Sequence, residues 1–293
     1  MNIAIQKPQQ ALAWRIEFAD RGEEPPHIRE PRLAWVHIHK VDAPAVLLDT
    51  TAPEGAVNGL TFVFLPTGVA TPFEVQKHAA ESWMAPRPGE DGGTLEIQFR
   101  SERLLWRRGR ALCFGSSQAT AEVLAAVSRF SFCESELARL EEQVQMSWVT
   151  LEGDMGLMKR LSSRDLKHQD HINAMTRTAT AMSVAYVRLQ AALETPPKDL
   201  TGPARRLFLE LALQADAVDR LRRLDDAIEV LEDFYGDMRE QLSEFRYFKK
   251  EYLVTFLILL VLFSELLISV EKITPWISEF CTNVLWTICR AHG

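Results

Sequence analysis

The sequence has few cysteines and fewer basic than acidic residues. Its four cysteines are Cys113, Cys133, Cys281 and Cys289, too few and too scattered for a disulfide framework or a zinc knuckle. We expect free thiols in a reducing compartment. Lys and Arg number 33 against 40 Asp and Glu, a net charge of −7. This acidic balance argues against nucleic acid as the partner.

N-terminal targeting signals and known catalytic motifs are also missing from the sequence. The first residues contain no apolar core of a secretory signal and are not rich in Arg or Ser, so we expect no signal or transit peptide. We find no phosphate-binding Walker loop, dinucleotide fingerprint, nucleophile elbow, His-Glu-x-x-His or kinase set. We therefore expect no enzyme, no bound cofactor and no metal.

One long apolar segment near the end of the chain stands out. Residues 252–270 read YLVTFLILLVLFSELLISV, with no charge before Glu265. A helix of this length spans roughly 28 Å, close to the thickness of a bilayer's hydrocarbon core. We expect a transmembrane helix rather than a buried core helix. Its anchor residues would be Tyr252, Leu253, Phe256, Leu260, Phe263 and Leu267.

The residues that flank this segment indicate an orientation. Arg246, Lys249 and Lys250 precede it as a basic collar, which places the N-terminal side in the cytoplasm. The expected location is a bacterial inner membrane, favoured over the mitochondrial inner membrane. Glu265 and Glu271 are candidates for an oligomer contact or a pore-lining group. Residues 271–293 form an amphipathic tail, expected to lie on the membrane surface, with a second span as the alternative.

Residues 116–251 carry helical, heptad-like periodicity. Val123, Phe130, Leu137, Val144 and Leu151 lie seven residues apart. A second seam follows spacings of three and four and consists of Leu221, Leu224, Ile228, Leu231, Tyr235, Met238, Leu242 and Phe245. This pattern predicts one helix over 204–251 that continues into 252–270. Packing within one chain and a parallel homo-oligomer both satisfy the pattern.

Residues 31–115 differ, because helical periodicity is absent and turn residues are dense. Strands are expected over 32–41, 45–49, 60–65, 94–100 and 110–114, with a short helix over 73–84. Residues 1–30 are expected to be partly irregular. The predicted fold class is α+β: a small α/β domain, then a long-helix hairpin or a three-helix coiled-coil bundle that continues into the transmembrane helix.

Three clusters of polar residues are weaker candidates. His37 and His39 share one face of a strand, and His168 and His171 lie near Asp165, but neither set completes a metal site. The chain's basic cluster suits lipid headgroups or RNA, although an ordinary polar face of a strand and turn is favoured. It consists of Arg100, Arg103, Arg107, Arg108 and Arg110.

The C-terminal half resembles the Required-for-Meiotic-nuclear-Division family. The resemblance lies in residues 116–119 with 132–137, in residues 223–235 with Met238 and Leu242, and in Glu251-Tyr252 before the apolar run and Glu265. It covers about residues 116–270. The resemblance implies a non-enzymatic, membrane-anchored scaffold or tether that self-associates. We also expect a protein partner, of unknown identity.

The architecture is also similar to that of the CorA cation-channel family. That family has an N-terminal α/β domain, long helices and a membrane-entering helix near the C-terminus. Its Gly-Met-Asn motif is absent here, where residues 269–275 read SVEKITP. The alternative function is therefore a CorA-like oligomeric cation channel or transporter that lacks the motif. That alternative requires residues 252–270 and 276–291 both to span the membrane.

Overall fold

The computed structural model describes two compact units. It describes residues 11–18, 36–41, 59–66, 72–86, 93–116, 119–156, 168–196, 198 and 200–291, without the side chains of 36–39, 72–76 and 267–291. The first unit comprises residues 1–152 and 177–232, and the second comprises 153–176 and 233–293. The N-terminal part is α/β and the C-terminal part is helical.

The first unit contains a six-stranded sheet in the order β2-β1-β3-β6-β5-β4. Neighbouring strands are antiparallel except β3 and β6, which are parallel. The strands are β1 (Leu12–Phe18), β2 (Val36–Val41), β3 (Gly59–Pro66), β4 (Leu95–Phe99), β5 (Glu102–Arg107) and β6 (Arg110–Gly115). The central strands β3 and β6 are buried on both faces, which explains their continuous apolar sequences.

Two tight hairpins connect the last three strands. Phe99 pairs with Glu102, which leaves Arg100 and Ser101 as a two-residue loop. Arg100 has a φ of 56°, a left-handed conformation that is uncommon for a residue other than glycine. Gly109 adopts a φ of 78° in the next loop, where the absence of a Cβ removes the strain.

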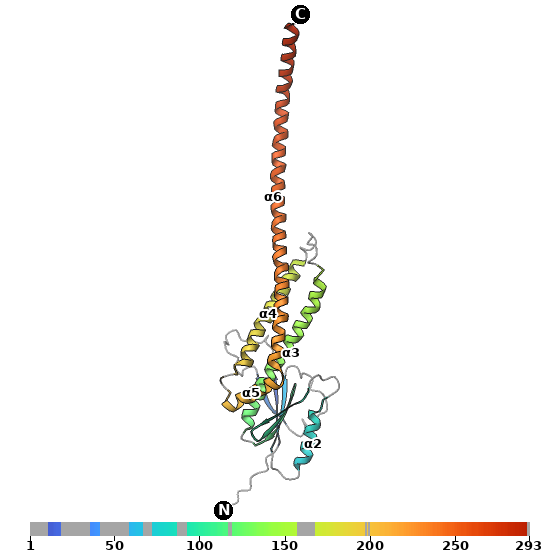
Figure 1. The fold of residues 1–293 in the computed structure, drawn as a ribbon. Coiled ribbons are helices and arrows are strands. Elements are labelled where there is room, and N and C mark those ends of the chain that lie inside the picture. Colours follow the sequence, from blue (N-terminus) through green and yellow to red (C-terminus); the bar gives the residue numbers. More distant parts are fainter. Residues whose placement is uncertain are drawn as a thin grey trace, which may run out of the picture. The chain divides into compact units, whose positions relative to one another are not determined.

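Helices cover both faces of the sheet (Figure 1). On one face, α2 (Pro72–Met84) packs Trp83 and Met84 into a core that includes Val63 and Leu112. On the other face, α3 and α5 contribute a chain of ring contacts. Trp106 of β5 packs edge-on against Phe130 of α3, which in turn packs against Phe208 of α5.

The helical part contains four described helices, namely α3 (Thr120–Asp154), α4 (Gln169–Glu194), α5 (Gly202–Gln214) and α6 (Ala217–Ala291). The side chain of Thr201 caps α5 by accepting a hydrogen bond from the N–H of Ala204. Asp216, with a φ of 50°, separates α5 from α6. The long helix expected over 204–251 is therefore two helices, because a left-handed residue interrupts the apolar periodicity.

Part of the sheet was not expected from the sequence. Residues 12–18 form β1 inside a segment predicted to be partly irregular, and 102–107 form β5. Four of the expected strands and the short helix have counterparts in β2, β3, β4, β6 and α2. The strand expected over 45–49 lies outside the described residues.

The expected transmembrane helix over 252–270 is wrong. Within the described part of the chain, none of the helices has a stretch long and apolar enough to cross a membrane. The uncharged run extends only from Tyr252 to Ser264 and follows directly on Glu251. At about 1.5 Å per residue these residues cover roughly 20 Å, well short of the hydrocarbon core.

Candidate functional site

The predicted apolar seam of α6 is covered within one chain for most of its length. In the first unit, Leu221, Leu224, Ile228 and Leu231 are all buried. In the second unit, Tyr235, Met238 and Leu242 are buried as well, whereas Phe245 is half-buried. A single chain therefore satisfies the seam as far as Leu242.

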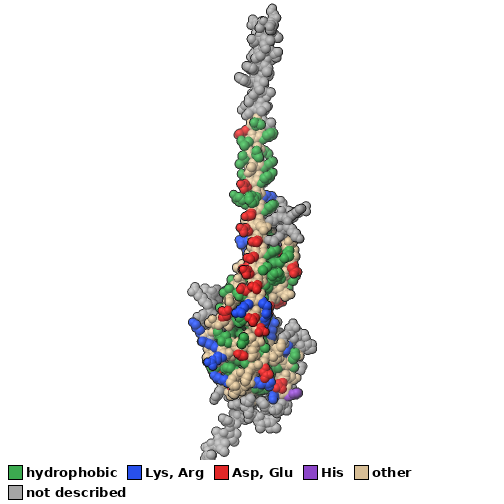
Figure 2. Space-filling model, in the orientation of Figure 1, with side chains coloured by type: hydrophobic (Ala, Val, Ile, Leu, Met, Phe, Trp, Pro, Cys, Tyr) green, Lys and Arg blue, Asp and Glu red, His purple; other side chains and the backbone are tan. Residues whose placement is uncertain are grey.

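Beyond the seam, α6 exposes an apolar segment that we define as residues 252–266. Its large apolar side chains are all between 51% and 75% exposed. These side chains are Tyr252, Leu253, Val254, Phe256, Leu257, Ile258, Leu259, Leu260, Val261, Leu262, Phe263 and Leu266. Figure 2 shows hydrophobic side chains gathered along this part of α6. Contiguous exposed apolar surface of this extent is typical of an interaction site.

Charged residues occupy the helix just before the apolar segment. The collar residues Arg246, Lys249 and Lys250 are exposed. Asp233, Asp237, Glu240 and Glu244 are also exposed, at spacings of three and four that place them on one helical face, opposite the seam. Glu265 is exposed within the apolar segment. The side chains of Leu267 and Glu271 lie outside the described set.

A buried ion-pair cluster joins α6 to α3 in the first unit. Arg220 donates to Glu134 from Nη1 at 2.6 Å, and to Glu141 from Nε at 2.8 Å and Nη2 at 2.7 Å. Burial raises the pKa of Glu134, while the hydrogen bond from Arg220 opposes the shift. Glu134 and Glu141 are seven residues apart, so they share a face of α3; this spacing is the sequence signal that could have found the cluster.

The second unit contains a polar cluster around Asp154. Its Oδ2 accepts a hydrogen bond from the Tyr235 hydroxyl at 3.0 Å and lies 2.8 Å from Nε2 of His171. Burial and the hydrogen bond to Asp154 raise the pKa of Tyr235. Tyr235 is fully buried. The cluster links the end of α3, the start of α4 and the first third of α6. We assign it a structural role.

The predicted basic cluster does not form one surface. Arg107 and Arg110 are buried, and Arg110 donates to the Trp83 carbonyl at 2.6 Å. Arg103 pairs with Glu96 at 2.7 Å and with Glu81 at 3.2 Å. Arg100 and Arg108 are exposed in different hairpin loops. Burial and separate local partners, rather than a shared exposed face, therefore account for these side chains.

The described cysteines and histidines do not form a metal centre. Within the described ranges, no group of three or more His, Cys, Asp or Glu could hold a metal ion. His171 instead contacts Asp154, and the side chains of His37 and His39 fall outside the description. Cys113 and Cys133 are free and buried, and burial raises the pKa of each to about 12, so neither is an activated nucleophile.

The chain was compared with protein-family models and with curated protein sequences. No protein-family model and no curated protein sequence matches the chain. The resemblances to the Required-for-Meiotic-nuclear-Division and CorA families therefore stay predictions.

Proposed function

We propose that this protein is a self-associating, non-enzymatic scaffold whose copies join along the apolar segment 252–266 of α6. The observation that supports the proposal is the exposure of that segment. Burial of a half-exposed Leu, Ile or Phe side chain stabilises an assembly by about 1 kcal/mol. The dozen apolar side chains of the segment together give a strong driving force for association.

The heptad pattern favours a second copy of the chain as the occupant. The seam's spacing of three and four continues past Phe245 through Lys249 and Tyr252 to Phe256, Leu259, Phe263 and Leu266. These last residues are exposed, whereas their counterparts as far as Leu242 are buried. The same stripe on a parallel copy would cover them by knobs-into-holes packing.

The distribution of charge fits the same arrangement. The acidic residues Asp233, Asp237, Glu240 and Glu244 lie opposite the stripe. In a parallel assembly they face outward, which keeps like charges of different copies apart. The helices can then approach one another without bringing carboxylates together.

The apolar segment favours more than two copies. Val254, Leu257, Ile258 and Val261 lie off the stripe and are each more than half exposed. A pair of helices covers mainly the stripe itself and leaves these residues in water. A larger bundle covers more of the circumference, and it would gather several α/β units for an unknown protein partner.

Disulfide cross-linking tests this geometry directly. Leu259→Cys is introduced into a full-length chain in which Cys281 and Cys289 are replaced by Ser. In a parallel, in-register bundle the new thiols of neighbouring copies meet, because Leu259 lies on the stripe. Mild oxidation should give a covalent species of two chains in denaturing electrophoresis.

Glu244→Cys in the same background is the matched control. Its thiol lies on the outward acidic face, so it should remain uncross-linked under the same oxidation. Equal cross-linking at both positions, or none at Leu259→Cys, would contradict the proposal. Cross-linking that appears only after phospholipid vesicles are added would also contradict it, since lipid would then be the required partner.

The two remaining expectations depend on a membrane. A lipid bilayer as partner, and a bacterial inner-membrane location with a cytoplasmic N-terminal domain, stay predictions. The channel alternative requires two spanning helices per chain, and the helices that the structure describes contain none. We therefore propose a scaffold and not a channel.

A further inference from the structure

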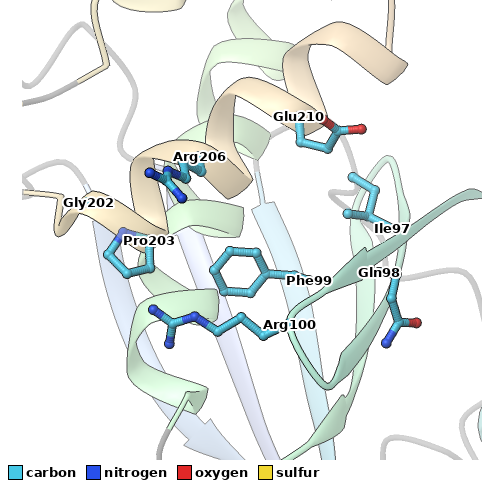
Figure 3. A pocket seen from close by; sticks show the side chains of 8 residues that line it. All are labelled: Ile97, Gln98, Phe99, Arg100, Gly202, Pro203, Arg206 and Glu210. Atoms are coloured by element: carbon cyan, nitrogen blue, oxygen red, sulfur yellow. The ribbon is translucent and has the colours of Figure 1, made fainter.

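A pocket opens in the first unit between the β4–β5 hairpin and the start of α5 (Figure 3). Its volume is about 510 Å³, enough for a small organic molecule. Ile97, Phe99 and Pro203 give it an apolar lining. In Figure 3 the ring of Phe99 lies between the hairpin and the helix, and the guanidinium groups of Arg100 and Arg206 lie on either side of Pro203.

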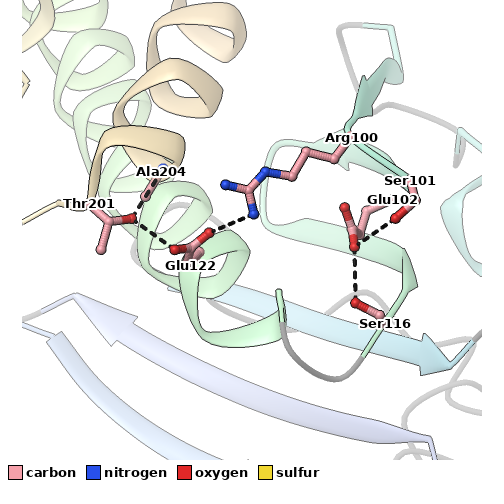
Figure 4. A network of polar contacts seen from close by, with 7 residues as sticks. All are labelled: Arg100, Ser101, Glu102, Ser116, Glu122, Thr201 and Ala204. Atoms are coloured by element: carbon pink, nitrogen blue, oxygen red, sulfur yellow. Dashed lines mark hydrogen bonds and ion pairs between the residues drawn. The ribbon is translucent and has the colours of Figure 1, made fainter.

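Arg100 is held at the pocket by its backbone and by a polar network (Figure 4). Its left-handed φ of 56° turns the hairpin. Its Nη1 lies 3.4 Å from Oε2 of Glu122, whose Oε1 accepts a hydrogen bond from Thr201 at 3.3 Å. The guanidinium carbon also lies 5.3 Å from the centroid of the Phe99 ring.

Arg206 brings a second positive charge from the opposite wall. It is exposed and has no ion pair or hydrogen bond to any residue that the structure describes. Glu210, four residues further along α5, would be its usual partner on a helix. Glu210 instead accepts a hydrogen bond from Gln214 at 2.8 Å. Arg206 is therefore available to a ligand.

The backbone of α5 offers little to such a ligand. The N–H of Ala204 is already capped by Thr201, and Pro203 has no N–H. Recognition of a negative charge would therefore depend on the two guanidinium groups. Arginine binds phosphate and carboxylate in preference to other anions, because its planar fork matches their paired oxygens.

We propose that this pocket binds a small anion that carries an aromatic group, with its phosphate or carboxylate between Arg100 and Arg206 and its ring against Phe99. The two positive charges fix the anionic end. The lining of Ile97, Phe99 and Pro203 covers the ring. The site is independent of the assembly through α6.

Titration of the full chain with phenyl phosphate, followed by isothermal calorimetry, tests the site. We expect saturable binding to one site per chain, weakened about tenfold or more in Arg206→Gln and in Arg100→Gln, since each loses a charge-assisted contact. Arg239→Gln is the control: it removes an exposed arginine outside the pocket and should bind as the unmodified chain does. Thermal unfolding of each variant checks that the fold is retained.

Two further ligands test separately the contributions of the aromatic ring and of the anionic group to binding. Inorganic phosphate should bind at least about tenfold more weakly than phenyl phosphate, because it leaves the apolar lining uncovered. The affinity of benzoate, compared with that of phenyl phosphate, shows whether the site prefers a carboxylate or a phosphate. Either preference supports the proposal. No binding of either aromatic anion, or equal affinity in Arg206→Gln and the unmodified chain, would overturn it.

Discussion

Arg220 donates two parallel hydrogen bonds to Glu141, from Nε to Oε1 at 2.8 Å and from Nη2 to Oε2 at 2.7 Å. The third nitrogen of the same guanidinium reaches Glu134. The Glu134 side chain is only 7% exposed and that of Arg220 only 23%. The first turn of α6 is thereby fixed to the middle of α3. An orphaned Glu134 would be a buried and uncompensated charge.

Replacement of Arg220 should therefore be costly. We expect Arg220→Met to lower the free energy of unfolding by about 3 kcal/mol, because it leaves Glu134 buried without its cation. Urea denaturation followed by circular dichroism measures the change. Arg222→Met, which loses only an exposed pair to Asp219, should change stability by less than about 0.5 kcal/mol. A similar loss in both variants would show that the burial of Glu134 is not the cause.

The hydroxyl of Tyr235 gives a pH-dependent prediction. Tyr235→Phe should lower the free energy of unfolding by about 1–2 kcal/mol at pH 8, because it removes a hydrogen bond to the Asp154 carboxylate. The pKa of Tyr235 is raised in the folded state, so the proton is held more tightly there than in the unfolded chain. This contribution is complete below the ordinary pKa of about 10 and declines as the pH rises above it.

The advantage of the unmodified chain over Tyr235→Phe should therefore shrink between pH 8 and pH values above about 10. Urea titrations of both proteins across this range measure the difference between their free energies of unfolding. Effects of pH on other ionisable groups are common to both proteins and cancel in this difference. An advantage that grows as the pH rises would contradict the assigned direction of the shift.

Gly115 has no room for a side chain. A Cβ at this position would collide with Cγ of the buried Glu102. We expect Gly115→Ala to cost about 1–3 kcal/mol through overpacking. Gly153→Ala is the matched control, since a Cβ there meets nothing within 4 Å and alanine favours the helix. If Glu102 is the obstacle, most of the penalty should vanish in a Glu102→Ala background.

The two buried thiols should be chemically silent in the folded protein. With a pKa of about 12, Cys113 and Cys133 each carry only about one thiolate in ten thousand at pH 8. Iodoacetamide at that pH should modify both residues in urea and neither in the native chain, as measured by peptide mass spectrometry. Rapid modification of native Cys133 would mean that α3 opens far more readily than its packing indicates.

The sequence predicts the parts of the fold that depend on local periodicity. The strand β3 and the buried stripe from Leu221 to Leu242 follow from apolar spacing alone. The strand β1 was missed because its short alternation lies within residues 1–30, a segment that Pro25 and Pro26 led us to interpret as partly irregular. The break at Asp216 was missed because a single left-handed residue leaves the apolar spacing on either side intact.

The candidate sites were harder to predict, because their residues lie far apart in the chain. The partners of Arg220 are about eighty residues away, and the pocket combines Arg100 with Arg206. Such contacts depend on tertiary packing. The apolar segment 252–266 was found from its composition, but its length was overestimated as a membrane span because Glu265 was counted within it.

The most direct test of the assembly proposal is the mass of the full chain in detergent-free buffer, measured by light scattering. We expect a species of at least three 33.3 kDa chains. The paired variant Phe256→Asp, Phe263→Asp should return to the mass of one chain, because charge on the stripe is incompatible with its burial. An unmodified chain that remains a monomer or a dimer at the same concentration would contradict assembly through the apolar segment.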